Sequence, residues 1–152
     1  MILISACLAG IDCKYNGGNN LKEEILKLVK EKKAILVCPE QLGGLATPRV
    51  PCEIVGGGGQ AVLEKQAKVM NKNGEDQTTC FLKGAEETLK IAKLYDVRTA
   101  IFKGKSPSCG SGTIYDGNFS GNKKDGDGVT AALLKNEGIR VVDEETFIKG
   151  IK

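Results

Sequence analysis

The strongest constraint on the fold comes from three short, mostly apolar segments, each followed by a loop that contains a cysteine. These segments are residues 2–6, 34–37 and 98–102. Continuous apolar runs of this length, bounded by turn residues, are typical of strands that are buried on both faces, as in a parallel sheet. Parallel strands need a crossover connection, and residues 21–30, between the first two segments, show the apolar spacing of an amphipathic helix. The pattern therefore predicts βαβ organisation.

The rest of the chain continues this alternation around one irregular part. Helical spacing returns from Thr78 to Tyr95 and in residues 128–135, and residues 139–142 are expected to form a last strand. Residues 38–49 are expected to form a loop. Residues 52–70 are expected to form a small β insertion made of 53–55, 61–63 and 68–70 around four consecutive glycines. The chain is therefore predicted to be one α/β domain, residues 1–152, with a mostly parallel sheet. The glycine run is not a Walker phosphate loop, because no Gly-Lys-Ser/Thr follows and no helix is expected there.

The absence of histidine limits the chemistry of this chain. With no His among 152 residues, an imidazole base, a Ser-His-Asp or Cys-His pair and every zinc site that uses imidazole are excluded. Six cysteines are too few for a disulfide scaffold, and no secretory signal is recognised, so a reducing cytoplasm is expected. A net charge of +3 with 5% aromatic residues provides no surface typical of nucleic-acid binding, and no apolar run is long enough to span a membrane.

Cys7, Cys38 and Cys109 occupy equivalent positions in the loops that follow the first three predicted strands. Ligands bind at the carboxyl ends of the strands of an open parallel sheet, so these loops are expected to meet at one crevice. One such cysteine would most simply be a small buried hydrophobic residue, but three at one edge favour a metal site. Three thiolates without imidazole suit either an iron–sulfur cluster or a thiolate-rich zinc site.

The other cysteines leave the number of ligands open. Cys13 follows Cys7 by six residues and could reach the same site, whereas Cys52 borders the insertion and Cys80 opens a predicted helix. Three ligands would leave one iron of a four-iron cluster free for a substrate, whereas four would indicate a structural or electron-transfer role.

Residues suited to proton transfer lie in the same loops. Glu40 follows Cys38 by two residues and is expected at the mouth of the crevice, where a partly desolvated carboxyl group can exchange protons with a substrate. Ser106 and Ser108 flank a proline in the third loop and could orient a water molecule or a substrate carbonyl. The competing interpretations are a solvated glutamate and ordinary turn serines.

Arg49 and Tyr15 are candidates for substrate binding. Arg49 could hold a polar heterocycle or an anion, although a surface arginine is equally compatible with the sequence. Tyr15 lies in a turn after Cys13 and is assigned the same class of role, against the simpler interpretation of a turn residue.

Together these motifs resemble the DUF523 family, which includes a thiouracil desulfidase. The resemblance runs in one order from Met1 to about Gly138 and is carried by Ser5–Gly10, Cys13–Gly17, Cys38–Glu40, Gly43–Leu45, Pro48-Arg49, Ser106–Gly110 and Tyr115–Gly117. It implies a Rossmann-like, three-layer domain that uses a [4Fe-4S] cluster to remove sulfur from a thiolated nucleobase such as 2-thiouracil, without redox chemistry. The products would be the oxo base and hydrogen sulfide.

The resemblance also implies a role for individual residues. The cluster ligands would be Cys7, Cys38 and Cys109, and Glu40 would be the proton-transferring acid, assisted by one of the two serines. The partner would be a small thiolated heterocycle. Two other classes stay open: an iron–sulfur or thiol-based sensor of oxidants or iron, and a thiolate-zinc protein with a structural role. Glu40 discriminates the desulfidase from the sensor, because only hydrolysis needs a proton-transferring carboxyl group.

Overall fold

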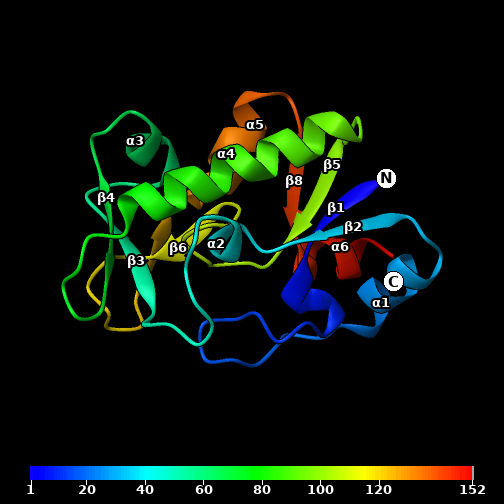
Figure 1. Ribbon diagram of the computed structural model, residues 1–152, viewed down its shortest axis with the longest axis horizontal. Helices are drawn as coiled ribbons and strands as arrows, with labels where there is room; N and C mark the ends of the chain where they lie inside the picture. The colour runs from blue at the N-terminus through cyan, green and yellow to red at the C-terminus, as the bar shows by residue number, and fades with distance from the viewer. Residues whose placement is uncertain (152) are drawn as a thin grey trace.

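Four parallel strands form the central sheet, in the order β2-β1-β5-β8 (Figure 1). The strands are β1 (Ile2–Ser5), β2 (Ala34–Val37), β5 (Thr99–Phe102) and β8 (Arg140–Asp143). In register, Ile2 of β1 lies opposite both Ala34 and Thr99. The structure is a computed structural model that describes residues 1–151, so Lys152, the last residue of the predicted domain, lies outside the described residues. The predicted parallel sheet is confirmed.

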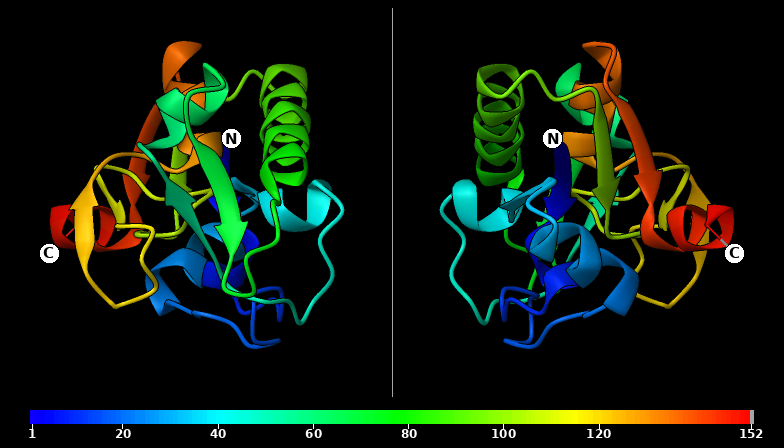
Figure 2. Two further views of the ribbon diagram at one scale, coloured as in Figure 1. Left: turned by 90° about the vertical axis from the view of Figure 1, so that its left-hand side faces the viewer. Right: turned by 90° about the vertical axis from the view of Figure 1, so that its right-hand side faces the viewer.

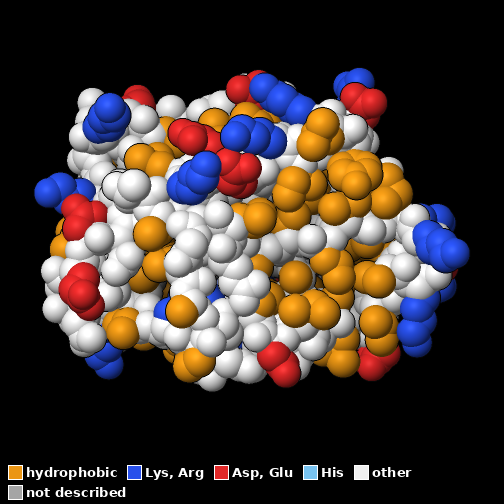
Figure 3. Space-filling view, in the orientation of Figure 1, with side chains coloured by type: hydrophobic (Ala, Val, Ile, Leu, Met, Phe, Trp, Pro, Cys, Tyr) orange, Lys and Arg blue, Asp and Glu red, His pale blue; other side chains and the backbone are white. Residues whose placement is uncertain are grey.

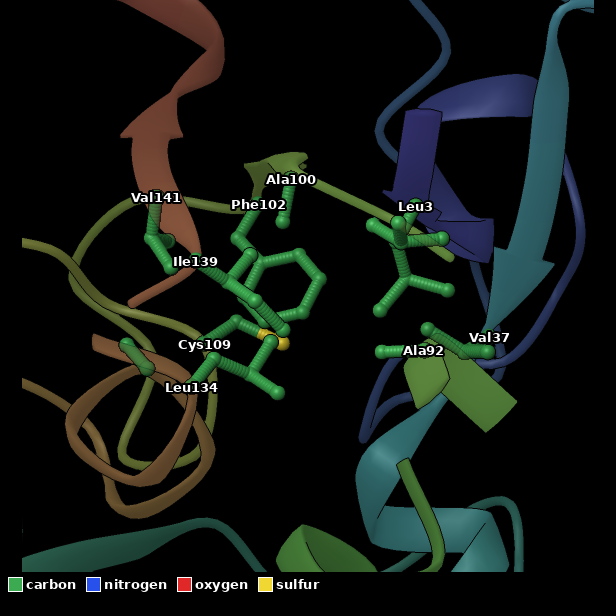
Figure 4. Packing of buried hydrophobic residues seen from close by; sticks show 11 residues of the cluster. Leu3, Val37, Ala92, Ala100, Phe102, Cys109, Leu134, Ile139 and Val141 are labelled. Atoms are coloured by element: carbon green, nitrogen blue, oxygen red, sulfur yellow. The ribbon is translucent and has the colours of Figure 1, made fainter. Parts of the chain in front are cut away.

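Helices cover both faces of this sheet, because its strands alternate apolar side chains between the two faces. The helices α4 (Thr78–Leu94) and α5 (Val129–Asn136) pack on the face that carries Leu3 and Phe102, a core shown in Figure 4. The helices α1 (Glu23–Lys30) and α6 (Glu144–Gly150) pack on the face that carries Ile4 and Ile101. Figure 2 shows α4 and α6 on opposite sides of the strands. The predicted three-layer α/β architecture is therefore confirmed.

A second core lies under the predicted β insertion, at the left of Figure 1. The strands β3 (Cys52–Val55) and β4 (Lys68–Asn71) form an antiparallel hairpin that packs on α4 and α5 through the buried residues Ile54, Val69, Phe81 and Val129. The insertion is confirmed, but the strand predicted at residues 61–63 is wrong. That segment belongs to the short helix α3 (Gly59–Leu63).

The start of α3 is fixed by a distant part of the chain. The Gly59 backbone amide donates to the Asp127 carbonyl at 2.7 Å, and the backbone of Gly128 approaches so closely that a β-carbon at position 59 would collide with it. An apolar run of three residues does not distinguish a short helix from a strand, so this contact decides the conformation.

Two further helices and a hairpin were not predicted. The expected loop at 38–49 begins with the helix α2 (Pro39–Leu42), whose proline stands at the first helical position, a recognised start signal. The helix α6 is capped by Asp143, whose side chain accepts a bond of 2.7 Å from the Thr146 amide. The strands β6 (Thr113–Tyr115) and β7 (Lys123–Asp125) form a second antiparallel pair.

The helix α2 is held against α4 by close contact between two glycines and the opposing backbone. Gly43 faces the Cys80 carbonyl and Gly84 faces the Pro39 carbonyl, so closely that a β-carbon at either glycine would collide. This contact fixes the distance between the two helices. The position of Glu40, in the first turn of α2, depends on it.

The solvent-facing side of α4 is charged, whereas its other side is buried in both cores. Glu87 pairs with Lys83 at 2.8 Å and with Lys90 at 3.0 Å, and charges of both signs are visible along the upper edge of the molecule in Figure 3. Exposed apolar side chains, among them Leu94 and Tyr95, occur where this helix ends. None of the helices within residues 1–151 combines the length and apolar character that a membrane crossing requires.

Candidate active site

The three strand-end cysteines meet at one cavity of about 560 Å³. Cys7 lies in the 3₁₀ helix η1 (Ala6–Ala9), directly after β1, and Cys38 caps α2 directly after β2. Cys109 lies in the loop after β5 and also contacts the sheet core beside Phe102 (Figure 4). The cavity is at the carboxyl edge of the sheet, where β1 separates β2 from β5, and this is the place where α/β sheets bind ligands.

A fourth thiol, Cys13, joins this group. Cys13 is 2% exposed, lines the same cavity and is hydrogen-bonded to both Cys7 and Cys38. The Cys38 sulfur also lies 3.8 Å from the Cys13 carbonyl oxygen. Cys52 lines the cavity as well, whereas Cys80 lies on α4 outside the lining.

These hydrogen bonds change the acidity of the thiols. The bond from Cys13, with smaller contributions from the Gln41 amide and Arg49, lowers the pKa of Cys38 to about 6. The pKa of Cys7 is lowered for the same reason, because Cys13 donates to it. Burial has the opposite effect on Cys109 and raises the pKa of that thiol. Because Cys13 has a single S–H proton, it donates to only one of these two sulfurs at a time, and the sulfur that accepts is stabilised as a thiolate, the form that binds metal.

Glu40 lies at the centre of a hydrogen-bonded group on the wall of the cavity. Its Oε1 accepts from Arg49 Nε at 2.9 Å, and its Oε2 accepts from the Ser108 hydroxyl at 2.8 Å. The Glu40 side chain is 14% exposed and the Arg49 side chain 8% exposed. Both carboxylate oxygens are thus held in place next to the thiols.

The structure distinguishes the two serines. The Ser106 hydroxyl accepts from the backbone amides of Ser108 and Cys109, at 3.2 and 3.1 Å, and lies 2.9 Å from the Ser108 hydroxyl. Ser106 therefore stabilises the turn that carries Cys109, whereas Ser108 contacts the carboxylate directly. The same turn docks on the first amides of α5, since Val129 donates to the Pro107 carbonyl at 2.8 Å.

Arg49 and Tyr15 both line the cavity, in different environments. Besides Glu40, the Arg49 guanidinium donates to Thr47 Oγ1 and to the Cys13 carbonyl, each at 2.9 Å, and to the Ala46 carbonyl at 3.3 Å. Most of its donors therefore hold other parts of the site. Tyr15 is 45% exposed, and its backbone carbonyl accepts from the Arg49 amide at 2.7 Å. A substrate-binding role for either residue stays a prediction.

Sequence reasoning missed three polar residues around Cys7 and Cys109. Asn20 and Lys103 lie close enough to Cys7 to lower its pKa, and the Ser5 hydroxyl is hydrogen-bonded to Cys109. Lys103 immediately follows β5 and Ser5 ends β1, so both lie at the same carboxyl edge of the sheet as the cysteines. Their places at the ends of predicted strands could therefore have identified them. Asn20 carries no comparable signal in the sequence.

The donor set suits an iron–sulfur cluster. Thiols are the usual ligands of such clusters, and Cys7, Cys13, Cys38 and Cys109 border a space large enough for a group of several atoms. In residues 1–151, no three side chains of His, Cys, Asp or Glu are gathered into a group that could hold a metal ion.

Three comparisons with known proteins each find a match over nearly the whole chain. The sequence model of the 2-thiouracil desulfurase family matches residues 2–146. The protein YbbK of Bacillus subtilis (strain 168) is 55% identical over 144 residues, which is 95% of each chain. Among solved structures, the [4Fe-4S]-dependent thiouracil desulfidase TudS superposes with a TM-score of 0.85 at 38% identity, over 97% of this chain and 93% of that one.

Proposed function

Since the chain belongs to the 2-thiouracil desulfurase family, we propose that it is an enzyme that uses a [4Fe-4S] cluster to hydrolyse the C=S bond of a thiolated nucleobase such as 2-thiouracil. One observation carries the proposal: Glu40, paired with Ser108, lies on the wall of the cavity into which the strand-end thiols converge. The structural relative TudS is a [4Fe-4S]-dependent thiouracil desulfidase, which supports the cofactor.

Cys7, Cys38 and Cys109 would hold the cluster. When bound through three thiolates, the cluster would supply a free iron that acts as a soft Lewis acid toward the thiocarbonyl sulfur. The lowered pKa of Cys7 and of Cys38 supports their assignment as ligands, because those thiols lose their protons readily. Cys13 would stay beside the ligands as a hydrogen-bond partner.

Glu40 would act as the general base and general acid for the proton of the attacking water. Hydrolysis converts C=S and water into C=O and hydrogen sulfide, so protons move from water to sulfur and no electrons are exchanged. A carboxylate can accept the first proton and return it to the leaving sulfur. Arg49 holds one carboxylate oxygen, and Ser108 bonds to the other, so that the group keeps one orientation during both transfers.

The cavity would have to hold the heterocycle near both groups. Tyr15 offers an exposed aromatic side chain at the cavity, which supports a contact with a flat base. All six cysteines are free thiols, which supports the proposed location in a reducing cytoplasm.

The decisive experiment is reconstitution with iron and sulfide under anaerobic conditions, followed by incubation with 2-thiouracil without a reductant. The expected result is a brown protein with about four irons per chain, loss of the thione absorbance and release of sulfide. A brown protein that desulfurates no member of a panel of thiolated pyrimidines would favour the sensor alternative. A colourless protein with stoichiometric zinc would favour the structural one.

Replacement of each cysteine tests the ligand set. Alanine at Cys7, Cys38 or Cys109 is expected to abolish the brown colour, whereas alanine at Cys52 or Cys80 is expected to preserve it. If Cys13→Ala removed the colour as completely as the first three, a four-thiolate site would replace the proposed three-thiolate site.

A further inference from the structure

Glu53 is a second carboxyl group on the cavity wall, and the proposed proton transfer does not use it. It is half-buried on β3, in the hairpin that packs on α4 and α5. None of the ion pairs within residues 1–151 includes Glu53. Because a partly desolvated carboxylate is costly without a partner, its oxygens need hydrogen-bond donors in place of a cation.

One oxygen of Glu53 holds a loop that forms part of the same wall. Its Oε1 accepts from the backbone amides of Gly117 at 2.9 Å and Phe119 at 3.2 Å, in the loop 116–122 that joins β6 to β7. Phe119 lines the cavity, and Gly117 lies so close to β3 that a β-carbon there would collide with the Ile54 carbonyl. The two amides therefore fix the orientation of the Glu53 carboxyl group.

The other oxygen of Glu53 has no hydrogen-bond donor within residues 1–151, since both amides bond to Oε1. In the same residues, Thr130 Oγ1 is the one buried side-chain polar atom that lacks a partner. Glu53 Oε2, which also lacks one, is therefore open to solvent, and a ligand can reach it. A carboxylate oxygen only accepts hydrogen bonds, so the group that it would bind is a donor.

We propose that Glu53 is a substrate-binding residue whose Oε2 accepts a hydrogen bond from a ring N–H of the thiolated base. The proposal rests on the proposed function and names the residue that selects the substrate. In 2-thiouracil, both ring nitrogens next to the thiocarbonyl carbon carry such a donor. Glu40 already accepts from Arg49 and Ser108, which leaves Glu53 as the cavity carboxylate with an oxygen free for the base.

Glu53→Gln separates this role from that of holding the loop. The amide oxygen can take over both bonds from Gly117 and Phe119, whereas the amide nitrogen replaces Oε2 and presents a donor to the ring N–H. On reconstituted protein, KM for 2-thiouracil is expected to rise about 10–100-fold, with kcat and the thermal melt little changed. Glu75→Gln is the matched control, because Glu75 accepts from Asn71 at 3.0 Å but lies outside the cavity lining.

Binding of uracil, measured by calorimetry on the reconstituted protein, tests the contact apart from turnover. Uracil carries the same ring N–H donors but has no sulfur to lose. Its Kd is expected to rise about 10-fold or more in Glu53→Gln and to stay unchanged in Glu75→Gln. Uracil that binds wild-type protein and Glu53→Gln equally, or binds neither, overturns the inference. Binding through Glu53 without desulfuration of any thiolated pyrimidine would refute the proposed function alone.

A methylated base gives a readout that needs no variant. Wild-type protein is expected to bind uracil methylated on both ring nitrogens at least about 10-fold more weakly than uracil, because no N–H is left to donate. In Glu53→Gln the difference between the two compounds should shrink. Equal affinity of wild-type protein for the two compounds overturns the inference, even if Glu53→Gln fails to fold.

Discussion

Ser108 donates a hydrogen bond of 2.8 Å to Glu40, although 68 residues separate the two in the chain. Glu40 lies in the helix that follows β2, and Ser108 lies in the loop that follows β5. These strands are not neighbours, because β1 runs between them. Since all three strands point the same way, the loops at their carboxyl ends meet across β1. The bond therefore joins the carboxyl group to the turn that carries Cys109.

The first expectation concerns the charge of Glu40. Glu40→Gln keeps the shape of the side chain and can still bond to Ser108, but an amide cannot accept and return a proton. Turnover of 2-thiouracil is expected to fall by about 10²–10⁴-fold, whereas the visible absorbance of the cluster persists. Both are measured on the same reconstituted sample. Turnover at the wild-type rate would show that the proton role is wrong, even though the cluster assignment would survive.

Replacement of Ser106 and replacement of Ser108 are expected to have different effects on stability and turnover. Ser108→Ala removes the direct partner of Glu40, so turnover should fall about 10–100-fold with little change in stability. Ser106→Ala leaves the Ser108 and Cys109 amides without their acceptor, at a cost of about 1–3 kcal/mol in the free energy of unfolding. Urea melts and steady-state kinetics on both variants separate the two effects. Equal kinetic losses with equal stability would contradict the distinction.

Gly84 is expected to control the position of Glu40 from a distance. A β-carbon in Gly84→Ala would collide with the Pro39 carbonyl and push α2 away from α4. We expect a loss of about 1–3 kcal/mol in unfolding free energy, together with reduced turnover. Gly150→Ala is the matched control, because nothing lies within 4 Å of its β-carbon position. If Gly84→Ala and Gly150→Ala melted alike, the packing of α2 on α4 would be looser than described.

The reactivity of Cys38 in cluster-free protein is expected to follow an unusually low pKa. The group is a protonated, slow thiol below pH about 6 and a reactive thiolate above it, whereas its ordinary value is 9.0. Burial raises the pKa of Cys52 to about 12, so that residue should react slowly throughout the neutral range. Alkylation by iodoacetamide as a function of pH, followed on peptides 34–49 and 50–65, measures both in one sample.

Removal of Cys13 provides the control for this titration. The hydrogen bond from Cys13 is the largest cause of the low value at Cys38. In Cys13→Ala, the alkylation midpoint of Cys38 should therefore move up toward its ordinary value. A midpoint that stayed near pH 6 would mean that Arg49 and the Gln41 amide, and not the thiol, stabilise the thiolate.

The parallel sheet, and the edge of it at which the candidate site residues gather, could be predicted from the amino-acid sequence alone. Fully apolar runs of strand length require burial on both faces, and only helices on each side of a parallel sheet provide it. Once the strands are parallel, residues that follow them must gather at one edge, which places Cys7, Cys38, Glu40 and Cys109 near one another. The gathering of these residues at one edge therefore follows from the direction of the strands and does not depend on where the side chains point.

How these groups pair with one another is apparent only in the folded structure. Sequence spacing does not show which serine bonds to Glu40, or that the Arg49 guanidinium donates to Glu40 and to the Cys13 carbonyl. It also does not show that Cys13 lies between Cys7 and Cys38. Each depends on side chains that meet across a strand, at distances that local periodicity does not encode. The conformation of residues 61–63 was missed for the same reason. Its apolar side chains specify burial, but the backbone contact between Gly59 and Asp127 selects a helix.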